Sequence, residues 1–391
     1  MDNTFTSLFL KTKETLVKHK LSWAFRSRAG QAGADSLHLS SAMEWLKTSQ
    51  DGSKDSGISA YFDLLKHSWA YSYPETTGYI IPTFLAYADT SQKYEFEERA
   101  IRMGDWEIAV QLPSGACRAG DVRNRFPRVF NTGQVILGWC SLFRRTSDPK
   151  YLRAAVDASS WLVRVQDDDG KWTRHTYQGP RTYHARVSWA LLETYALSER
   201  KVFLKAAQKN LSWVLSQQTD NGWFRNTSLS DPNSPWTHLI AYTVQGLLES
   251  HRLLSNSALS TNVYAGAKRA ASKLRTVYAA SSFLLPSSLD ARWKSSDLYS
   301  CLTGDAQIAV VWLKLHATSG DSTYRKAALR MIGELKTIQR ADHRDPALRG
   351  GIPGSYPVDG AYARYKLLSW ATKFFADALL LKANSRLVLG G

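Results

Sequence analysis

The chain has 391 residues, of which 44% are hydrophobic, so it is long and apolar enough to bury a large core. It carries 50 Lys and Arg against 34 Asp and Glu, and the formal charge of +16 favours polyanionic partners such as acidic polysaccharide, anionic lipid or nucleic acid. The basic residues are dispersed and form no known nucleic-acid-binding motif, which argues against nucleic acid.

The cysteines and the hydropathy of the chain indicate in which cellular compartment the protein is expected. Three cysteines, Cys117, Cys140 and Cys301, show no CxxC or Cys/His zinc spacing, and so sparse a set indicates a reducing environment. The first residues contain only a short apolar run before Lys and Glu, and no run of 18 apolar residues follows, so neither a signal peptide nor a membrane span is predicted. We therefore expect a cytoplasmic protein without a metal or an organic cofactor.

In chain order, residues 1–37 are interpreted as an N-terminal extension with a short helix at about 5–20 and a linker. From residue 38 onward, amphipathic and apolar helices alternate, separated by long polar loops. The predicted amphipathic helices are residues 39–50, 94–111, 151–166, 203–218, 262–278 and 324–339. The predicted apolar helices begin near residues 77, 132, 184, 238, 303 and 364.

The apolar helices recur about every 50 to 65 residues, which indicates an internal repeat of one helical hairpin. Six such hairpins predict an all-α (α/α)6 toroid over residues 38–391, with the charged helices outside and the apolar helices inside. No alternating pattern is long enough to compete with this arrangement. Because the inner helices run parallel, their N-termini and the long loops before them should meet at one central cleft.

The first inner helix opens with an aromatic and acidic turn, YSYPETTGY, from residue 71. Glu75 is the leading candidate for a general acid or base, since it lies at the helix start among hydroxyl groups. The alternative is a capping carboxylate. Tyr73 beside it is predicted to stack on a sugar ring.

The third inner helix opens with RTYHARVSW, which gathers Arg181, Tyr183, His184 and Arg186. A Tyr or His base together with arginines would suit the neutralisation of a uronate carboxylate and the removal of its C5 proton. The alternative is a cluster that caps and packs the helix. In the second inner helix, Asn131 and Gln134 are candidates for binding sugar hydroxyls, again with capping as the alternative.

Three further candidates begin the fourth and fifth inner helices. Trp236 is expected to contact substrate, and His238 is either catalytic or a satisfied structural histidine. Asp305 would partner Glu75 in inverting hydrolysis, which needs two carboxyl groups about 6.5 to 9.5 Å apart, although a helix cap explains it equally well.

The last loop, GSYPVDGAYARY from residue 354, repeats the SYP of residues 72–74 and is expected to face the ligand as well. Within it, Asp359 is a candidate for positioning water. The substrate-binding candidates of this loop are Tyr356, Tyr362 and Arg364.

Taken together, YPETTGYIIPT, FNTGQVILGW, TYHARVSWALLE, the Thr237-His238 helix start, SCLTGDAQIAVVWL and GSYPVDGAYARY resemble proteins associated with bacterial exopolysaccharide and capsule gene clusters. The resemblance runs from about residue 39 to residue 381. That group is similar in architecture to six-hairpin glycosidases and to toroid polysaccharide lyases. The resemblance implies the toroid fold and a glycan substrate without settling the reaction.

Three functions follow as hypotheses. The first is a glycoside hydrolase-like enzyme acting on an acidic polysaccharide or oligosaccharide, with Glu75 as general acid and Asp305 or Asp359 positioning water. The second is a lyase or uronate C5-epimerase, with Tyr183 or His184 as base and Arg181, Arg186 or Arg364 holding the uronate. The third is a non-enzymatic toroid that binds nascent glycan or the polysaccharide-synthesis machinery.

Overall fold

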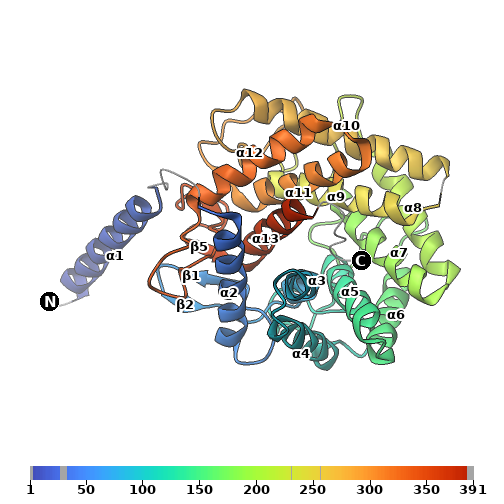
Figure 1. The fold of residues 1–391 in the computed structure, drawn as a ribbon, viewed down its shortest axis with the longest axis horizontal. Coiled ribbons are helices and arrows are strands. Elements are labelled where there is room, and N and C mark those ends of the chain that lie inside the picture. Colours follow the sequence, from blue (N-terminus) through green and yellow to red (C-terminus); the bar gives the residue numbers. More distant parts are fainter. Residues whose placement is uncertain (1–2, 27–32, 230, 256, 385–391) are drawn as a thin grey trace.

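The computed structural model describes residues 3–26, 33–229, 231–255 and 257–384. Within these ranges, helices alternate between an inner and an outer ring (Figure 1). The inner helices are α3 (Pro74–Ser91), α5 (Val129–Thr146), α7 (Ala185–Ser198), α9 (Thr237–Leu253), α11 (Leu302–Ser319) and α13 (Ser369–Ala383). The outer helices are α2 (Asp35–Ser53), α4 (Glu95–Val110), α6 (Pro149–Arg164), α8 (Lys201–Ser216), α10 (Ala258–Ala280) and α12 (Ser322–Ile338).

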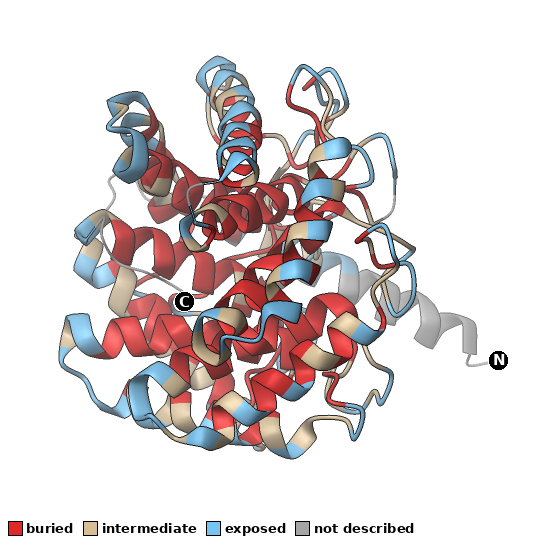
Figure 2. Ribbon diagram, turned by 90° about the vertical axis from the view of Figure 1, so that its right-hand side faces the viewer, coloured by how far each residue is buried: buried red, intermediate tan, exposed pale blue. Residues whose placement is uncertain are grey.

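The ring closes because α13, the last helix, packs against α2 and α3, the first pair. Each inner helix also packs against the next inner helix along the chain. Buried residues concentrate in the inner helices, whereas the outer helices expose their outward faces (Figure 2). The predicted (α/α)6 toroid is therefore confirmed, and the hydrophobic periodicity has the expected cause, because inner helices are buried all round and outer helices on one face.

Glycines set the close approach of neighbouring inner helices. A Cβ added at Gly78 of α3 would lie 2.4 Å from the Val135 Cα of α5, and one at Gly138 of α5 would lie 2.4 Å from the Gly78 carbonyl oxygen. Larger side chains at either position would push the two helices apart. The glycines of the YPETTGY and GQVILGW segments thus bring the starts of α3 and α5 together.

Short strands, which the sequence patterns did not predict, join distant parts of the chain. Strands β1 (Tyr61–Asp63), β2 (Ser68–Trp69) and β5 (Lys366–Leu368) form an antiparallel sheet in the order β2-β1-β5, with Phe62 opposite both Trp69 and Leu367. Strands β3 (Ser300–Cys301) and β4 (Ser355–Tyr356) form a second antiparallel pair. The first sheet links the first and last repeats.

The β5 strand also corrects one helix boundary. The last inner helix was predicted from residue 364 but begins at Ser369, because residues 366–368 pair with β1 instead. At the other end of the chain, the predicted helix at 5–20 is longer, since α1 spans Asn3–Arg26. Near its end, Ser22 hydrogen-bonds Tyr365, which brings α1 against the loop before β5.

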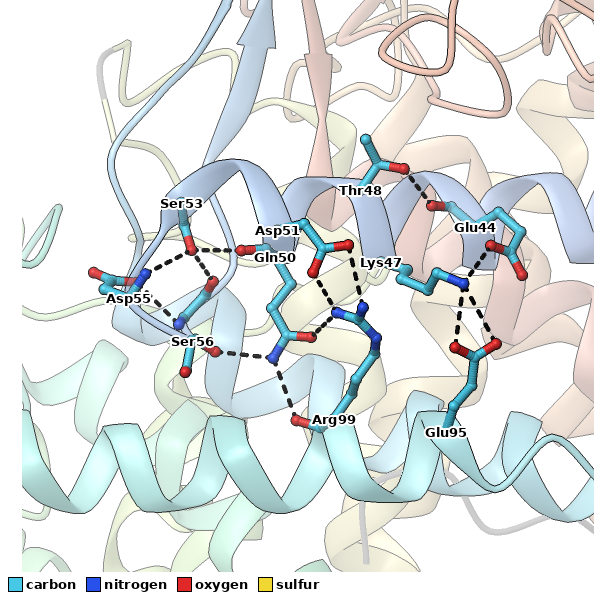
Figure 3. Close-up of polar contacts among 11 residues, drawn as sticks. Glu44, Lys47, Thr48, Gln50, Asp51, Ser53, Asp55, Ser56, Glu95 and Arg99 are labelled. Atoms are coloured by element: carbon cyan, nitrogen blue, oxygen red, sulfur yellow. Dashed lines mark hydrogen bonds and ion pairs between the residues drawn. The ribbon is translucent and has the colours of Figure 1, made fainter.

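The outer helices are joined partly by charged side chains. Between α2 and α4, Arg99 donates to Asp51 and Gln50, and Lys47 lies between Glu44 and Glu95 (Figure 3). Asp51 and Glu95 are exposed whereas Arg99 and Lys47 are partly buried, and ion pairs at such a surface contribute at most about 1 kcal/mol each. They hold the ring from outside, whereas the inner core supplies most of the stability.

Candidate active site

A cavity of about 260 Å³ lies where the N-terminal ends of inner helices meet the long loops. Residues from the starts of α3, α5 and α9 line it together with loop residues and the first turn of α13. The lining residues are Tyr73, Glu75, Phe130, Tyr177, Tyr183, Leu229, Trp236, His238, Leu239, Tyr242, Tyr362 and Trp370. The predicted convergence of helix starts therefore produces a cavity.

Among the described residues that line the cavity, Glu75 is the only acidic one. Tyr73 caps α3 in extended conformation, Pro74 occupies the first helical position, and Glu75 follows in the first turn. Proline suits that position because it has no N–H to satisfy, and a carboxylate in the first turn is favoured by the helix dipole. The chain thus points an acidic group into the cavity.

The pKa of Glu75 is raised from 4.5 to about 7, because burial disfavours the charged carboxylate. The neighbouring Tyr73 hydroxyl and the positive charge of Arg186 act in the opposite direction. Near neutral pH, Glu75 is therefore partly protonated. A carboxyl group in this state is suited to donate a proton and to take one back.

His238 lines the same cavity and is held between aromatic rings. Its ring centroid lies 4.8 Å from that of Tyr242 and 5.4 Å from that of Tyr362. Burial lowers the pKa of His238 to about 3, so the imidazole is neutral at physiological pH. Among the described residues, its Nδ1 atom has no hydrogen-bond partner. A neutral imidazole with a free nitrogen is suited to hydrogen-bond a sugar hydroxyl.

The rest of the lining is mainly aromatic. Five tyrosines and two tryptophans face the cavity, and such rings present flat apolar surfaces against which sugar rings stack. Burial raises the pKa of Tyr183, so its phenol stays neutral, and its hydroxyl has no partner among the described residues. The Tyr73 hydroxyl lies 3.4 Å from that of Tyr177. The site combines stacking surfaces with a few polar groups, as ligand cavities generally do.

Arg186 of α7 is buried outside the cavity lining and connects α7 to two neighbouring inner helices. Its guanidinium donates to Gln134 of α5 at 2.7 Å and to Gln245 of α9 at 2.7 Å. Its Cζ lies 4.9 Å from the ring centroid of Tyr242, which lines the cavity, and 5.9 Å from that of Tyr79. Both hydrogen bonds go to amide oxygens, so Arg186 keeps an uncompensated charge that acts on Glu75.

Six of the predicted site residues line the cavity, and the others lie elsewhere. The six are Tyr73, Glu75, Tyr183, Trp236, His238 and Tyr362. Arg181 lies in the turn that leads to Tyr183 and donates to the Pro180 carbonyl at 3.0 Å. Gln134 and Arg186 are occupied with each other, and Asn131 donates to the Arg118 carbonyl at 3.0 Å. The side chains of Asn131, Gln134 and Arg186 are therefore used in contacts within the protein and are not part of the cavity lining.

The structure places two of the predicted catalytic residues, His184 and Asp305, outside the cavity lining. His184 is 1% exposed and packs edge-on against Trp172, with both ring nitrogens unpartnered among the described residues, so it is a buried side chain of the hairpin. Asp305 is fully buried and accepts a hydrogen bond from the Leu285 N–H at 3.1 Å. Because Asp305 faces the loop before α11, it does not form a carboxylate pair with Glu75 across the cavity.

The last loop also differs from expectation, apart from Tyr362. Asp359 lies 3.7 Å from Arg26 of α1, and the Tyr356 hydroxyl donates to the Arg26 carbonyl at 3.0 Å. Arg364 is exposed. The similarity of the two SYP segments therefore did not indicate a shared position, since Tyr73 faces the cavity whereas Tyr356 packs against the end of α1.

Sequence reasoning missed the other six lining residues, and three of them show why. Tyr242 lies one helical turn after His238, and that spacing alone would have placed it on the same face. Trp370 was missed because the last helix was predicted to begin too early. Tyr177 comes from the middle of a long loop, where no periodicity indicates direction.

Over the described ranges, no cluster of His, Cys, Asp and Glu has the arrangement of a metal site, and no helix is both long and apolar enough to cross a bilayer. No protein-family model and no curated protein sequence matches the chain. Solved structures do match in fold.

Three of these structures are enzymes with different activities. The unsaturated glucuronyl hydrolase from Bacillus sp. GL1, responsible for the degradation of glycosaminoglycan, has a TM-score of 0.72 at 14% identity, covering 90% of this chain and 97% of that one. Cellobiose 2-epimerase from Bacillus thermoamylovorans has a TM-score of 0.67 at 11% identity, covering 87% and 98%. A polysaccharide lyase has a TM-score of 0.61 at 11% identity, covering 91% and 99%. The chain thus has the fold of six-hairpin glycosidase-like proteins.

Proposed function

We propose that the protein is a glycoside hydrolase-like enzyme that acts on a polysaccharide or its oligosaccharides, with Glu75 as proton donor. The observation that carries the proposal is the state of Glu75, a carboxyl group with a pKa of about 7 and no ion-pair partner among the described residues, in a cavity lined by aromatic rings. A carboxyl of raised pKa is the group that protonates the leaving oxygen in glycoside hydrolysis. The fold shared with carbohydrate-active enzymes supports the assignment as an analogy.

In the proposed reaction, the proton of Glu75 passes to the glycosidic oxygen while the bond from that oxygen to the anomeric carbon breaks. A water molecule then adds to the anomeric carbon, and its proton goes to the Glu75 carboxylate, which restores the starting state. One carboxyl serves both steps because the lining of the cavity provides no second one. The neutral His238 and the phenol of Tyr183 are assigned to hydrogen bonds with sugar hydroxyls.

The net charge of +16 favours an acidic glycan as the substrate. The resemblance to proteins of exopolysaccharide gene clusters would make this a bacterial surface glycan. Association with the machinery that synthesises such a glycan is part of the same proposal.

Lyase or epimerase chemistry is the second candidate, because Tyr183 lines the cavity and its hydroxyl has no partner among the described residues. The raised pKa of Tyr183 makes its phenolate scarce, so this candidate ranks below hydrolysis. Ultraviolet absorbance of the C4=C5 double bond distinguishes a lyase from a hydrolase, and an epimerase is recognised by product sugars inverted at C5 with no change in absorbance. The absorbance rises when a lyase acts, falls when an unsaturated uronide is consumed, and stays constant during hydrolysis of a saturated glycoside.

The test compares the wild-type protein, Glu75→Gln and Glu107→Gln on a panel of acidic oligosaccharides, with products identified by mass spectrometry. Glu107 is a matched control, because it is another buried carboxyl whose pKa is raised by burial, but it lies in α4 and outside the cavity. The expected result is cleavage by wild type and Glu107→Gln and loss of cleavage in Glu75→Gln. Cleavage that survives in Glu75→Gln would overturn the assignment, and a glycan that is bound but stays intact would favour the non-enzymatic alternative.

A further inference from the structure

Two arginines occupy equivalent places before the second and third inner helices. The segments Pro127-Arg128-Val129-Phe130 and Pro180-Arg181-Thr182-Tyr183 share the pattern of Pro, Arg, any residue and an aromatic residue. Arg128 and Arg181 both have extended backbones, at φ −142° and −136°. Arg128 immediately precedes α5, and Arg181 immediately precedes the 3-10 turn Thr182–His184 that leads into α7. The aromatic residue of each segment lines the cavity.

The two segments also lie side by side. The rings of Phe130 and Tyr183 meet edge to face with centroids 5.1 Å apart, and α5 packs against α7. Each arginine precedes its cavity-lining ring by two residues. The repeat therefore sets two guanidinium groups beside the part of the cavity that Phe130, Tyr177 and Tyr183 form.

Both guanidinium groups are held in place by neutral partners. The Arg128 Cζ lies 4.1 Å from the Tyr177 ring centroid, and its Nη1 donates to the Thr176 carbonyl. The Arg181 Nη1 donates to the Pro180 carbonyl at 3.0 Å. Both contacts leave the positive charge uncompensated while fixing the orientation of the side chain.

Neither arginine pairs with a carboxylate among the described residues, and the Nε atoms of both are buried without a hydrogen-bond partner. Arg123 in the same loop as Arg128 differs, because Asp121 accepts from its Nη2 at 2.7 Å. Partly buried guanidinium groups with unused N–H donors are unusual, since leaving such donors unpaired costs free energy. An anionic ligand at these partly exposed side chains would compensate their positive charge.

We propose that Arg128 and Arg181 form an anion-binding subsite at the edge of the cavity, which takes the carboxylate or sulfate group of an acidic oligosaccharide. This inference rests on the proposed function and names the residues that would select an acidic substrate. Guanidinium groups bind carboxylate and sulfate oxygens through paired N–H bonds, whereas a neutral sugar gains no such contact.

The position of the subsite also assigns the order of sugars. Among the described residues, no Lys or Arg lines the cavity around Glu75, so an uncharged sugar is assigned to that position. The anionic group belongs to the neighbouring sugar, beside Tyr177 and Tyr183. Consistent with this placement, burial raises the pKa of Tyr183 while the charges of Arg181 and Arg128 act to lower it.

The experiment measures binding by calorimetry in a Glu75→Gln background, which prevents turnover. The probes are three tetrasaccharides: one with glucuronate, one with glucuronate and sulfate, and the carboxyl-reduced neutral form of the first. Arg128→Gln and Arg181→Gln each remove one guanidinium. The matched controls are Arg125→Gln and Arg174→Gln, which remove the same charge from exposed positions of the same two loops.

The expected result is that the acidic probes bind at least about 10-fold more tightly than the neutral probe, as charge-assisted hydrogen bonds imply. This preference should fall about 10-fold in Arg128→Gln and Arg181→Gln and persist in the two controls. The probe with the larger preference identifies carboxylate or sulfate as the group bound. Equal binding of acidic and neutral probes, or an equal loss of preference in the controls, would overturn the proposal.

Two further measurements keep the inference separate from folding and from the proposed function. Arg128→Lys and Arg181→Lys retain the charge and should recover part of the preference, and a variant is scored only after its thermal unfolding matches that of the parent. Failure of all three probes to bind would contradict the proposed function as well. Binding with the expected preference, combined with cleavage that does not depend on Glu75, would contradict the proposed function alone.

Discussion

The two ends of the inner ring differ in whether their buried glutamates are ion-paired. Toward the C-terminal end, Glu193 accepts from Arg144 at 2.6 Å and from Arg252 at 2.5 Å, and Lys314 lies 2.5 Å from Glu249. At the N-terminal end, Glu75 has no ion-pair partner among the described residues, and the buried cation whose charge acts on it, Arg186, is bound to amide oxygens. The buried glutamates at the C-terminal end are neutralised by ion pairs, whereas Glu75 at the N-terminal end is not.

The pKa values follow from this difference. Burial alone would raise the pKa of Glu249, but the charges of Lys314 and Arg252 outweigh it and hold that pKa below its usual value. The pKa of Glu75 rises to about 7 because burial is not offset to the same extent. A buried glutamate with cations around it holds the ring together, whereas a buried glutamate without them is available for proton transfer.

The largest effect expected from this comparison is on catalysis. Glu75→Gln should lower kcat/KM for glycan cleavage by about 10² to 10⁴-fold, because the amide cannot donate the proton. Initial rates measured on the oligosaccharide that wild type cleaves provide the check. Circular dichroism should show an unchanged helical fold, and a loss smaller than 10-fold would place the proton donor elsewhere.

At the C-terminal end, the effect should be on stability. Glu249→Gln leaves the partly buried Lys314 without its counterion and should reduce the free energy of unfolding by about 3 kcal/mol. Urea denaturation measures the change. The folded fraction should keep its kcat, because Glu249 lies far along α9 from the cavity; a loss of kcat with unchanged stability would reverse the roles assigned to the two ends.

The same comparison predicts a dependence of stability on pH. Glu75 has a higher pKa folded, about 7, than unfolded, 4.5, so the folded state binds more protons and the carboxyl lowers stability as pH rises from about 4.5 to 7. Replacement by Gln removes this penalty. Glu75→Gln should therefore gain about 3 kcal/mol relative to wild type between pH 4 and pH 8, measured by urea denaturation at both pH values. Parallel stability profiles would contradict the raised pKa.

The smallest predicted effect concerns Tyr73. Its hydroxyl lowers the pKa of Glu75, so Tyr73→Phe should raise that pKa, by about one unit or less. Since the proton donor must be protonated, activity falls as pH rises through the pKa of Glu75. The high-pH limb of the kcat/KM profile should therefore move to higher pH in Tyr73→Phe. Movement to lower pH would show that the hydroxyl acts in the opposite sense.

Much of the fold could be predicted from the sequence because hydrophobic periodicity reports burial directly. The fully apolar helices became the inner ring, and the helices charged on one face became the outer ring. The last boundary failed because strand β5 takes residues 366–368 through pairing with β1, about 300 residues earlier, and no local pattern indicates such a partner.

The candidate site could be predicted less completely. Residues in the first turn of a helix, such as Glu75, Tyr183 and His238, were found because the toroid brings inner-helix starts together. Direction within that turn was not predictable, so adjacent Tyr183 and His184 were both proposed although only Tyr183 lines the cavity. The pairing of Arg186 with Gln134 depends on side chains that meet only in the folded core.

The most direct test of the central claim is a titration of the Glu75 carboxyl itself. The carboxyl carbons of glutamate, labelled with 13C, are followed by NMR from pH 3 to pH 9, and Glu75→Gln identifies the signal by its disappearance. A midpoint near pH 7 is expected, coincident with the high-pH limb of the kcat/KM profile. A midpoint at or below the ordinary glutamate value of about 4.3 would contradict this expectation, because Glu75 would then be a fully ionised capping group.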